Sequence, residues 1–261
     1  MADADALEPL RAEPRRSAIL CDIDGTLAPI VDDPEAAAVP AEAREWLRDL
    51  AARYLLVGCV SGRRASAARR MVGVDELVYA GNHGLELLRP GELEPRLDPA
   101  LGKRGAAAAG FAARLDWRDL ERAGLRLEDK GPIQAIHWRA APDPGLAAQR
   151  ARGLASLAHE EGLVPHFGRM VLELRPTADV HKGVAVKRLI DEAGAGRAMF
   201  GGDDRTDLDA FAALRALEAD GALELAVCVG VESDEGPAEI ADQADVLVSG
   251  ADGFATLLRA L

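Results

Sequence analysis

An unbroken apolar run that ends in two closely spaced aspartates constrains the fold of this chain more than any other stretch. Residues 18–21 (Ala-Ile-Leu-Cys) lead directly into Asp22, Ile23, Asp24 and Gly25. A short apolar run bounded by a turn is typical of a buried strand in a parallel sheet. Because ligands of open α/β sheets bind beyond the carboxyl ends of the strands, we expect Asp22 and Asp24 at the mouth of a site.

The two aspartates and the turn after them indicate a site for a cation and an anion. Two carboxylates this close repel each other unless a cation or a proton lies between them, and hard oxygen ligands suit Mg²⁺. Gly25 permits a sharp turn, and we expect the N–H groups of Gly25 and Thr26 to be free to face an anion. For Asp-x-Asp-Gly alone, a plain turn is the alternative, since both residue types favour turns.

The totals describe a globular chain with an acidic surface. Apolar residues make up 49% of the 261 residues, and the net charge is −13. This charge argues against a nucleic-acid partner, and an anionic substrate would need a local cluster of cations or a metal. The three cysteines lie in apolar runs without a metal-binding or paired spacing, so we expect buried thiols.

Neither a leader sequence nor a membrane span is indicated. Residues 1–16 are charged and lack an apolar region of the kind found in signal peptides, and no window has about 18 apolar residues. We expect a cytoplasmic monomer that has no membrane partner, with residues 1–16 as a loose arm.

The pattern of the remaining chain predicts a doubly wound α/β core with an inserted cap. Buried-type strands alternate with helices in residues 1–87 and again in 176–261. The expected core strands cover 18–21, 55–60, 77–80, 198–201, 226–229 and 246–248.

Residues 88–175 follow a different pattern, in which strands alternate apolar and polar residues. Such strands form a sheet with one buried and one open face. We expect helices over 103–122 and 144–162, and strands over 125–130, 133–139, 163–167 and 170–175. If the register aligns them, the open face of this α+β cap presents Arg126, Glu128, Lys130, His137, Arg139 and Glu173. An ordinary solvated face is the alternative.

Polar residues follow three further core segments and join Asp22 and Asp24 in one candidate site. Ser61, Gly62 and Arg63 could bind a phosphate or simply cap a helix. Lys182 begins a helix, where a cation is slightly disfavoured unless an anion is bound. Residues 202–207 (Gly-Asp-Asp-Arg-Thr-Asp) place three carboxylates at a strand end, and these read better as metal ligands and their supports than as helix caps.

Two motif sets carry a family resemblance. Asp-x-Asp-Gly-Thr-Leu after a strand resembles the first motif of the haloacid dehalogenase-like phosphatases. The ordered set D-x-D-G-T-L, S-G-R, G-N-H-G, E-D-K-G, H-W-R, E-L-R-P, H-K-G and G-D-D-R-T-D resembles the trehalose-6-phosphate phosphatases over nearly the whole chain.

The resemblance implies a role for each motif. Asp22 would be the nucleophile and Asp24 the general acid/base, with Lys182 supporting catalysis. Phosphate would be held by Gly25, Thr26, Ser61, Gly62 and Lys182. Mg²⁺ would be held by Asp22, the Asp24 carbonyl and Asp203, supported by Asp204 and Asp207. The disaccharide would be faced by Arg63, Asn82, His83, Glu128, Lys130, Arg139 and Glu173.

The resemblance therefore implies hydrolysis of trehalose 6-phosphate. Other capped sugar phosphatases, acting on sucrose 6-phosphate or a glycosyl-phosphoglycerate, share the catalytic core, and only the cap motifs separate them. A phospho-accepting receiver domain lacks the Asp-x-Asp-Gly-Thr loop and an inserted cap. A silent sugar-phosphate sensor is disfavoured because every catalytic position is filled.

Overall fold

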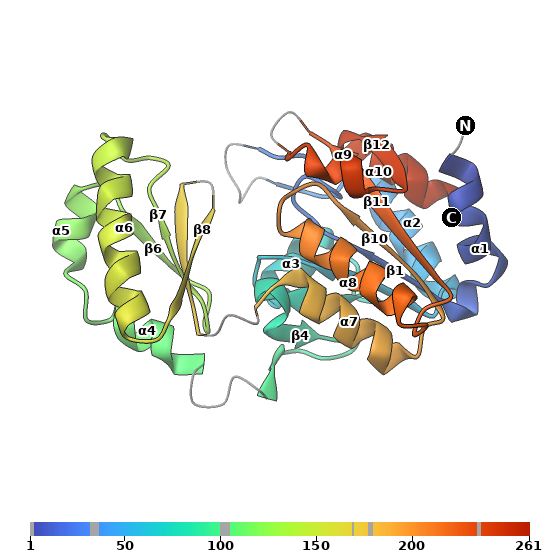
Figure 1. Ribbon diagram of the computed structural model, residues 1–261, viewed down its shortest axis with the longest axis horizontal. Helices are drawn as coiled ribbons and strands as arrows, with labels where there is room; N and C mark the ends of the chain where they lie inside the picture. The colour runs from blue at the N-terminus through green and yellow to red at the C-terminus, as the bar shows by residue number, and fades with distance from the viewer. Residues whose placement is uncertain (1–2, 32–36, 100–104, 169, 177–179, 234–235) are drawn as a thin grey trace. The chain divides into compact units, whose positions relative to one another are not determined.

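Two separate sheets divide the chain into two units (Figure 1). The computed structural model describes residues 3–31, 37–99, 105–168, 170–176, 180–233 and 236–261. Unit 1 comprises Met1–Arg96 and His181–Leu261, and unit 2 comprises Leu97–Val180. The first division lies beyond the change of sequence pattern at residue 88 because the main sheet takes in a further short strand at residues 96–97.

The main sheet has the strand order β12-β11-β10-β1-β2-β3-β4-β5. Its strands are β1 (Ser17–Cys21), β2 (Leu56–Val60), β3 (Val78–Gly81), β4 (Glu86–Leu88), β5 (Arg96–Leu97), β10 (Arg197–Gly202), β11 (Leu225–Glu232) and β12 (Val246–Ser249). Neighbours from β12 to β3 pair in parallel, whereas β3 and β4 pair antiparallel. The predicted doubly wound, mainly parallel sheet is confirmed, and β4 and β5 extend it beyond what the sequence predicts.

Helices cover both faces of this sheet. Side chains of α1, α2, α3 and α10 join one hydrophobic cluster, and those of α7, α8 and α9 join another. Because successive strand side chains point to opposite faces, Ile19 and Cys21 of β1 enter the first cluster and Ala18 and Leu20 the second. The helices are α1 (Asp3–Ala12), α2 (Ala41–Arg53), α3 (Ala65–Val72), α7 (Lys182–Ala193), α8 (Asp207–Ala219), α9 (Glu239–Gln243) and α10 (Gly250–Ala260). The three cysteines are buried free thiols, as predicted.

The N-terminal segment differs from the expected loose arm. Its described residues form α1 and a 3₁₀ turn, Pro14–Arg16. Leu7 and Leu10 are buried at 3% and 0% exposure against the main core. Arg197 of β10 donates to the carbonyl of Pro9 at 2.8 Å, which further fastens the helix. The expectation of a loose arm was therefore wrong, because two leucines are enough to dock this short helix.

Unit 2 has its own antiparallel sheet, ordered β6-β7-β9-β8. Its elements are α4 (Ala107–Ala112), α5 (Trp117–Arg122), β6 (Arg126–Asp129), β7 (Gln134–His137), α6 (Pro144–Glu160), β8 (Val164–Gly168) and β9 (Val171–Arg175). The single helix expected over 103–122 is wrong: two short helices stand there, and residues 103 and 104 lie outside the described residues. Asp116 interrupts the pattern because its carboxylate accepts the Asp119 N–H and so begins α5 anew.

Candidate active site

The end of β1 presents Asp22 to the carboxyl edge of the main sheet. The Asp22 N–H donates to the Gly201 carbonyl of β10 at 2.9 Å, which fixes the backbone where the strand ends. Asp22 is only 4% exposed, so its carboxylate is held inside the protein. The position confirms the expectation that this strand delivers a carboxylate to a sheet edge.

The turn after Asp22 uses its N–H groups differently from the expectation. The Gly25 N–H donates to the Ala28 carbonyl at 2.8 Å, and the Thr26 N–H to the Ile23 carbonyl at 3.3 Å. The two N–H groups are therefore not free to face an anion, because the turn closes on itself. The N–H groups of Ile23 and Asp24 have no acceptor among the described residues, and they are the donors that this loop offers to an anion.

Gly25 is required for space as well as for its backbone angle. Its φ is +90°, and a Cβ atom built there would lie 2.1 Å from Asp203 Oδ2. Gly91 has a similar φ of +81° but would meet nothing within 4 Å. The two glycines therefore separate the effect of the backbone angle from the effect of the close approach.

We expect Gly25→Ala to reduce the phosphatase activity that the sequence resemblance implies about tenfold or more, because Asp203 must move. Gly91→Ala should leave activity unchanged and lower the unfolding free energy by about 1–2 kcal/mol, the usual cost of a left-handed backbone angle. Steady-state assays and urea unfolding of both variants measure this. Equal activity of the two variants would contradict a role for the close approach.

Lys182 is the central cation of the site and is fully enclosed. It is the first residue of α7 and is 2% exposed. Its Nζ lies 3.0 Å from Asp22 Oδ1 and 2.7 Å from Asp207 Oδ1. The lysine therefore joins the end of β1 to the start of α8, and its position in a helix N-terminus is explained by these carboxylates.

Asp203, Asp204 and Asp207 divide their roles although they lie in one short string. Asp203 Oδ1 accepts the Thr26 hydroxyl at 2.9 Å. Asp207 Oδ2 accepts the N–H groups of Asp203 and Asp204, both at 3.0 Å. The side chain of Asp204 is 52% exposed and accepts the Thr206 N–H and hydroxyl at 2.7 Å. Asp204 thus shapes the turn before α8, whereas Asp203 and Asp207 point into the site.

Buried negative charge exceeds positive charge at this site. Burial raises the pKa of Asp203 to about 6 and that of Asp207 to about 7. Burial also raises the pKa of Asp22, and the neighbouring carboxylates add to the effect of burial, although Lys182 opposes it. Burial opposes the charge on Lys182, but Asp207 and Asp22 outweigh it and raise the pKa of the ammonium. One lysine therefore does not balance the carboxylates around it.

The buried carboxylates form a set that fits a hard cation. Among the described residues, oxygen atoms of Asp22, Asp203 and Asp207 lie within 4.8 Å of one another. An all-oxygen donor set with unbalanced negative charge is what Mg²⁺ requires. Asp207 already accepts Lys182 and two N–H groups, so Asp22 and Asp203 have the more available oxygens. The side chains of Asp24 and Asp204 are engaged elsewhere.

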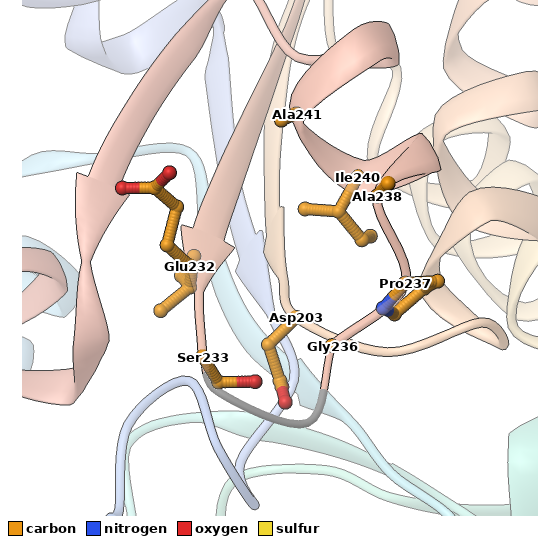
Figure 2. A pocket seen from close by; sticks show the side chains of 9 residues that line it. Asp203, Glu232, Ser233, Gly236, Pro237, Ala238, Ile240 and Ala241 are labelled. Carbon is orange, nitrogen blue, oxygen red and sulfur yellow. The ribbon is translucent and has the colours of Figure 1, made fainter.

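A small cavity lies beside Asp203 (Figure 2). Its volume is about 130 Å³, room for a few water molecules. It is lined by Asp203, Val231, Glu232, Ser233, Gly236, Pro237, Ala238, Ile240 and Ala241. Figure 2 shows the Ser233 hydroxyl and the Asp203 carboxylate on the same side of this cavity. The cavity therefore offers room for water beside Asp203, next to the end of β11.

The Ser61–Arg63 segment follows β2 and reaches the second aspartate. Ser61 is 1% exposed, and its Oγ accepts the Arg63 N–H at 3.2 Å. Arg63 donates from Nε and Nη2 to the two oxygens of Asp24, both at 2.7 Å. The sequence suggested Arg63 for the sugar, whereas the structure brings it to the predicted general acid.

Asn82 and His83 contact the Ser61–Arg63 segment and have left-handed backbone angles. Their φ values are 51° and 57°, which are strained for residues other than glycine. The strain is held by the Asn82 N–H on the Arg63 carbonyl, 2.7 Å, and the His83 N–H on the Ser61 carbonyl, 2.9 Å. His83 packs against Gly62, where a Cβ atom would lie 2.9 Å from its ring.

Glu86 supports the same segment, and the sequence reasoning missed it. It is 1% exposed, and its Oε2 accepts the Ala65 N–H at 2.9 Å, which caps α3 from β4. An acid inside the apolar run 85–88 was the available signal, because a buried carboxylate needs a partner.

The cap sheet brings three predicted sugar-binding residues together on one face. Glu128 of β6 and Glu173 of β9 each lie directly opposite Ala135 of β7. The side chains of both glutamates therefore lie on the same face of the sheet. Lys130 Nζ lies 3.1 Å from Glu173 Oε1 and 3.9 Å from Glu128 Oε2. Arg139 follows β7 in an exposed turn and has no polar partner among the described residues.

His137 was on the predicted open face and contacts Glu128. Its Nε2 lies 2.8 Å from Glu128 Oε2, and this hydrogen bond lowers the pKa of Glu128. The face is therefore a connected set of charges rather than a set of separate solvated side chains.

Comparisons with known proteins agree with this geometry. The profile of the trehalose-phosphatase family matches residues 20–244. A probable trehalose-phosphate phosphatase D of Arabidopsis thaliana is 34% identical over 210 residues, covering 74% of this chain and 56% of the relative. A trehalose-phosphate phosphatase of Mycobacterium avium is 37% identical over 206 residues, covering 77% and 52%. The chain thus spans about half the length of these curated relatives.

Solved structures share the fold over nearly the whole chain. The structure of Aspergillus fumigatus trehalose-6-phosphate phosphatase is 25% identical, with a TM-score of 0.64, and the match covers 98% of this chain and 96% of that chain.

No helix among the described residues is long and apolar enough to cross a bilayer. The matched profile, the relatives and the aspartate site lead to one assignment: the chain belongs to the trehalose-phosphatase family.

Proposed function

We propose that the chain hydrolyses trehalose 6-phosphate to trehalose and phosphate, with Mg²⁺ as its cofactor. The observation that carries the proposal is the Lys182 ammonium between Asp22 and Asp207, next to Asp203. A nucleophilic carboxylate, a buried cation and an oxygen-rich metal site are the elements that phosphoryl transfer needs.

In the proposed reaction, Asp22 attacks phosphorus and the bond from phosphorus to the sugar oxygen breaks. Asp24 gives its proton to that oxygen, and an aspartyl-phosphate remains on Asp22. Asp24 then takes a proton from the water that attacks phosphorus, which releases phosphate and restores Asp22. Arg63 holds both oxygens of Asp24 in this structure, so one of them must turn to the leaving group.

Mg²⁺ would be held by Asp22, Asp203 and the Asp24 carbonyl, with Asp207 in support. When bound, it supplies positive charge against the transferring phosphoryl group. Lys182 holds Asp22 in place and adds its own charge, and Ser61 offers a hydroxyl to the phosphate. The cap face with Glu128, Lys130, Arg139 and Glu173 would recognise the disaccharide through charge-assisted hydrogen bonds.

The decisive experiment measures phosphate release from trehalose 6-phosphate, sucrose 6-phosphate, a glucosyl-phosphoglycerate and glucose 6-phosphate, each with Mg²⁺ and with EDTA. We expect metal-dependent release with a clear preference for trehalose 6-phosphate. Preference for another sugar phosphate would keep the chemistry and overturn the substrate. No release from any of them would favour the sensor, which a thermal-shift titration with the same sugar phosphates would test.

We expect Lys130→Ala to lower kcat/KM for trehalose 6-phosphate about 10- to 100-fold, the loss of a charged hydrogen bond. The rate with p-nitrophenyl phosphate should not change, since a small aryl phosphate does not reach a sugar site. Arg150→Ala is the control, because Arg150 pairs with Asp119 at 2.7 Å on the helical side of the cap. An equal loss with both substrates would remove Lys130 from the sugar site.

A further inference from the structure

Arg175 is a buried cation of the cap that none of the roles above includes. It lies two residues after Glu173 on β9, so both side chains point to the same face of the strand. Its side chain is 7% exposed and that of Glu173 is 9% exposed. A buried guanidinium is destabilising unless its nitrogens are paired, so the partners of Arg175 indicate what it does.

All three guanidinium nitrogens of Arg175 make hydrogen bonds. Nε and Nη2 donate to Glu173 Oε2 at 3.2 and 2.8 Å. Nη1 donates to the Val180 carbonyl at 2.7 Å, which anchors the guanidinium at the end of unit 2. The plane of the guanidinium is therefore fixed, and it fixes the Glu173 carboxylate in turn.

The two oxygens of Glu173 consequently have separate partners. Oε2 faces Arg175, whereas Oε1 lies 3.1 Å from Lys130 Nζ. A carboxylate without the arginine could rotate about its last torsion, and Lys130 would lose its fixed partner. Binding would then include the cost of ordering both side chains.

We propose that Arg175 is a positioning residue for the sugar subsite: it holds Glu173 so that Glu173 and Lys130 are preset for the disaccharide. This inference rests on the proposed function, because it needs a sugar at the cap face. Arg175 itself acts through Glu173 and not by contact with the reacting atoms. Its loss should therefore affect sugar binding and leave phosphoryl transfer intact.

The test compares Arg175→Lys with Arg150→Lys in kcat and KM for trehalose 6-phosphate and p-nitrophenyl phosphate, with Mg²⁺ present. Lysine keeps the charge but cannot bind Glu173 and the Val180 carbonyl with a planar fork. We expect Arg175→Lys to raise KM for trehalose 6-phosphate about tenfold while kcat and the aryl phosphate rate stay within about twofold. Arg150→Lys should change none of these values.

A second comparison separates positioning from a merely structural role. In the Glu173→Gln background, Arg175→Lys should raise KM no further, because the carboxylate that it orients is gone. An unchanged KM in the single variant, equal damage to both substrates, or additive losses in the double variant would overturn the proposal. Wild-type protein inactive on trehalose 6-phosphate would instead overturn the proposed function, and this inference with it.

Discussion

Asp22→Asn should abolish phosphate release from every substrate, with a fall in kcat of about 10⁴-fold or more. The amide cannot attack phosphorus, and Asp24, the other carboxylate after β1, has both oxygens held by Arg63. The fold loss should be the same for trehalose 6-phosphate and p-nitrophenyl phosphate, since the step lost is common to both. Phosphate-release assays with Mg²⁺ measure the change, and Asp49→Asn is the control, because the Asp49 side chain lies on the solvent side of α2 and is 64% exposed.

The same variant should remain folded, which distinguishes a lost nucleophile from a lost structure. Burial raises the pKa of Asp22, so the ionised carboxylate opposes folding at neutral pH. Asn removes that charge, and Lys182 keeps Asp207 at 2.7 Å. We therefore expect an unfolding midpoint in EDTA that is unchanged or higher. Normal turnover, or a large loss of stability, would contradict the role given to Asp22.

Lys182→Met should remove both activity and much of the stability. The two buried carboxylates of Asp22 and Asp207 would lose their shared cation, and breaking a buried ion pair from one side costs about 3–5 kcal/mol. Lys187→Met is a matched control on the same helix, because Lys187 is 58% exposed and pairs with Asp191 at 3.0 Å. That exposed pair should contribute less than about 1 kcal/mol.

Urea unfolding in EDTA and phosphate-release assays in Mg²⁺ compare these two lysine variants. We expect Lys187→Met to match the wild type in both measurements. Equal unfolding free energies for the two variants would show that the ion pairs of Lys182 with Asp22 and Asp207 do not stabilise the fold.

The sequence predicts which residues gather at the catalytic edge of the sheet, because the carboxyl ends of neighbouring parallel strands lie side by side. Strands that are apolar throughout end at one sheet edge, so polar residues after β1 and β10 must meet there. Lys182 could be assigned to the same site because it begins a helix of the same predicted core. The resemblance sets Asp203 apart from Asp204 and Asp207, but the spacing of the three acids does not distinguish the last two, which only their hydrogen bonds separate.

Predictions from the local sequence pattern are wrong where tertiary packing decides the structure. Helix α1 contains Pro9, and Leu7 and Leu10 are its two large apolar side chains, so its formation depends on docking these leucines. The prediction for the turn after Asp22 was wrong for a different reason. Gly25 and Thr26 have N–H groups suited to an anion, but these groups donate to carbonyls within the turn. In the cap, Leu127 has the same alternation parity as the buried Leu125, yet it is 39% exposed because β6 is an edge strand.

The separate apolar clusters of the two units have a consequence for how such a chain can change over time. Among the residues that the structure describes, the cap cluster, which includes Phe111, Leu125 and Leu172, shares no member with the two clusters of the main sheet. Substitutions in the two units should therefore have independent, additive effects on folding. The cap can accumulate mutations that alter which sugar it accepts, while the residues that carry out the chemistry stay under their own, separate selection.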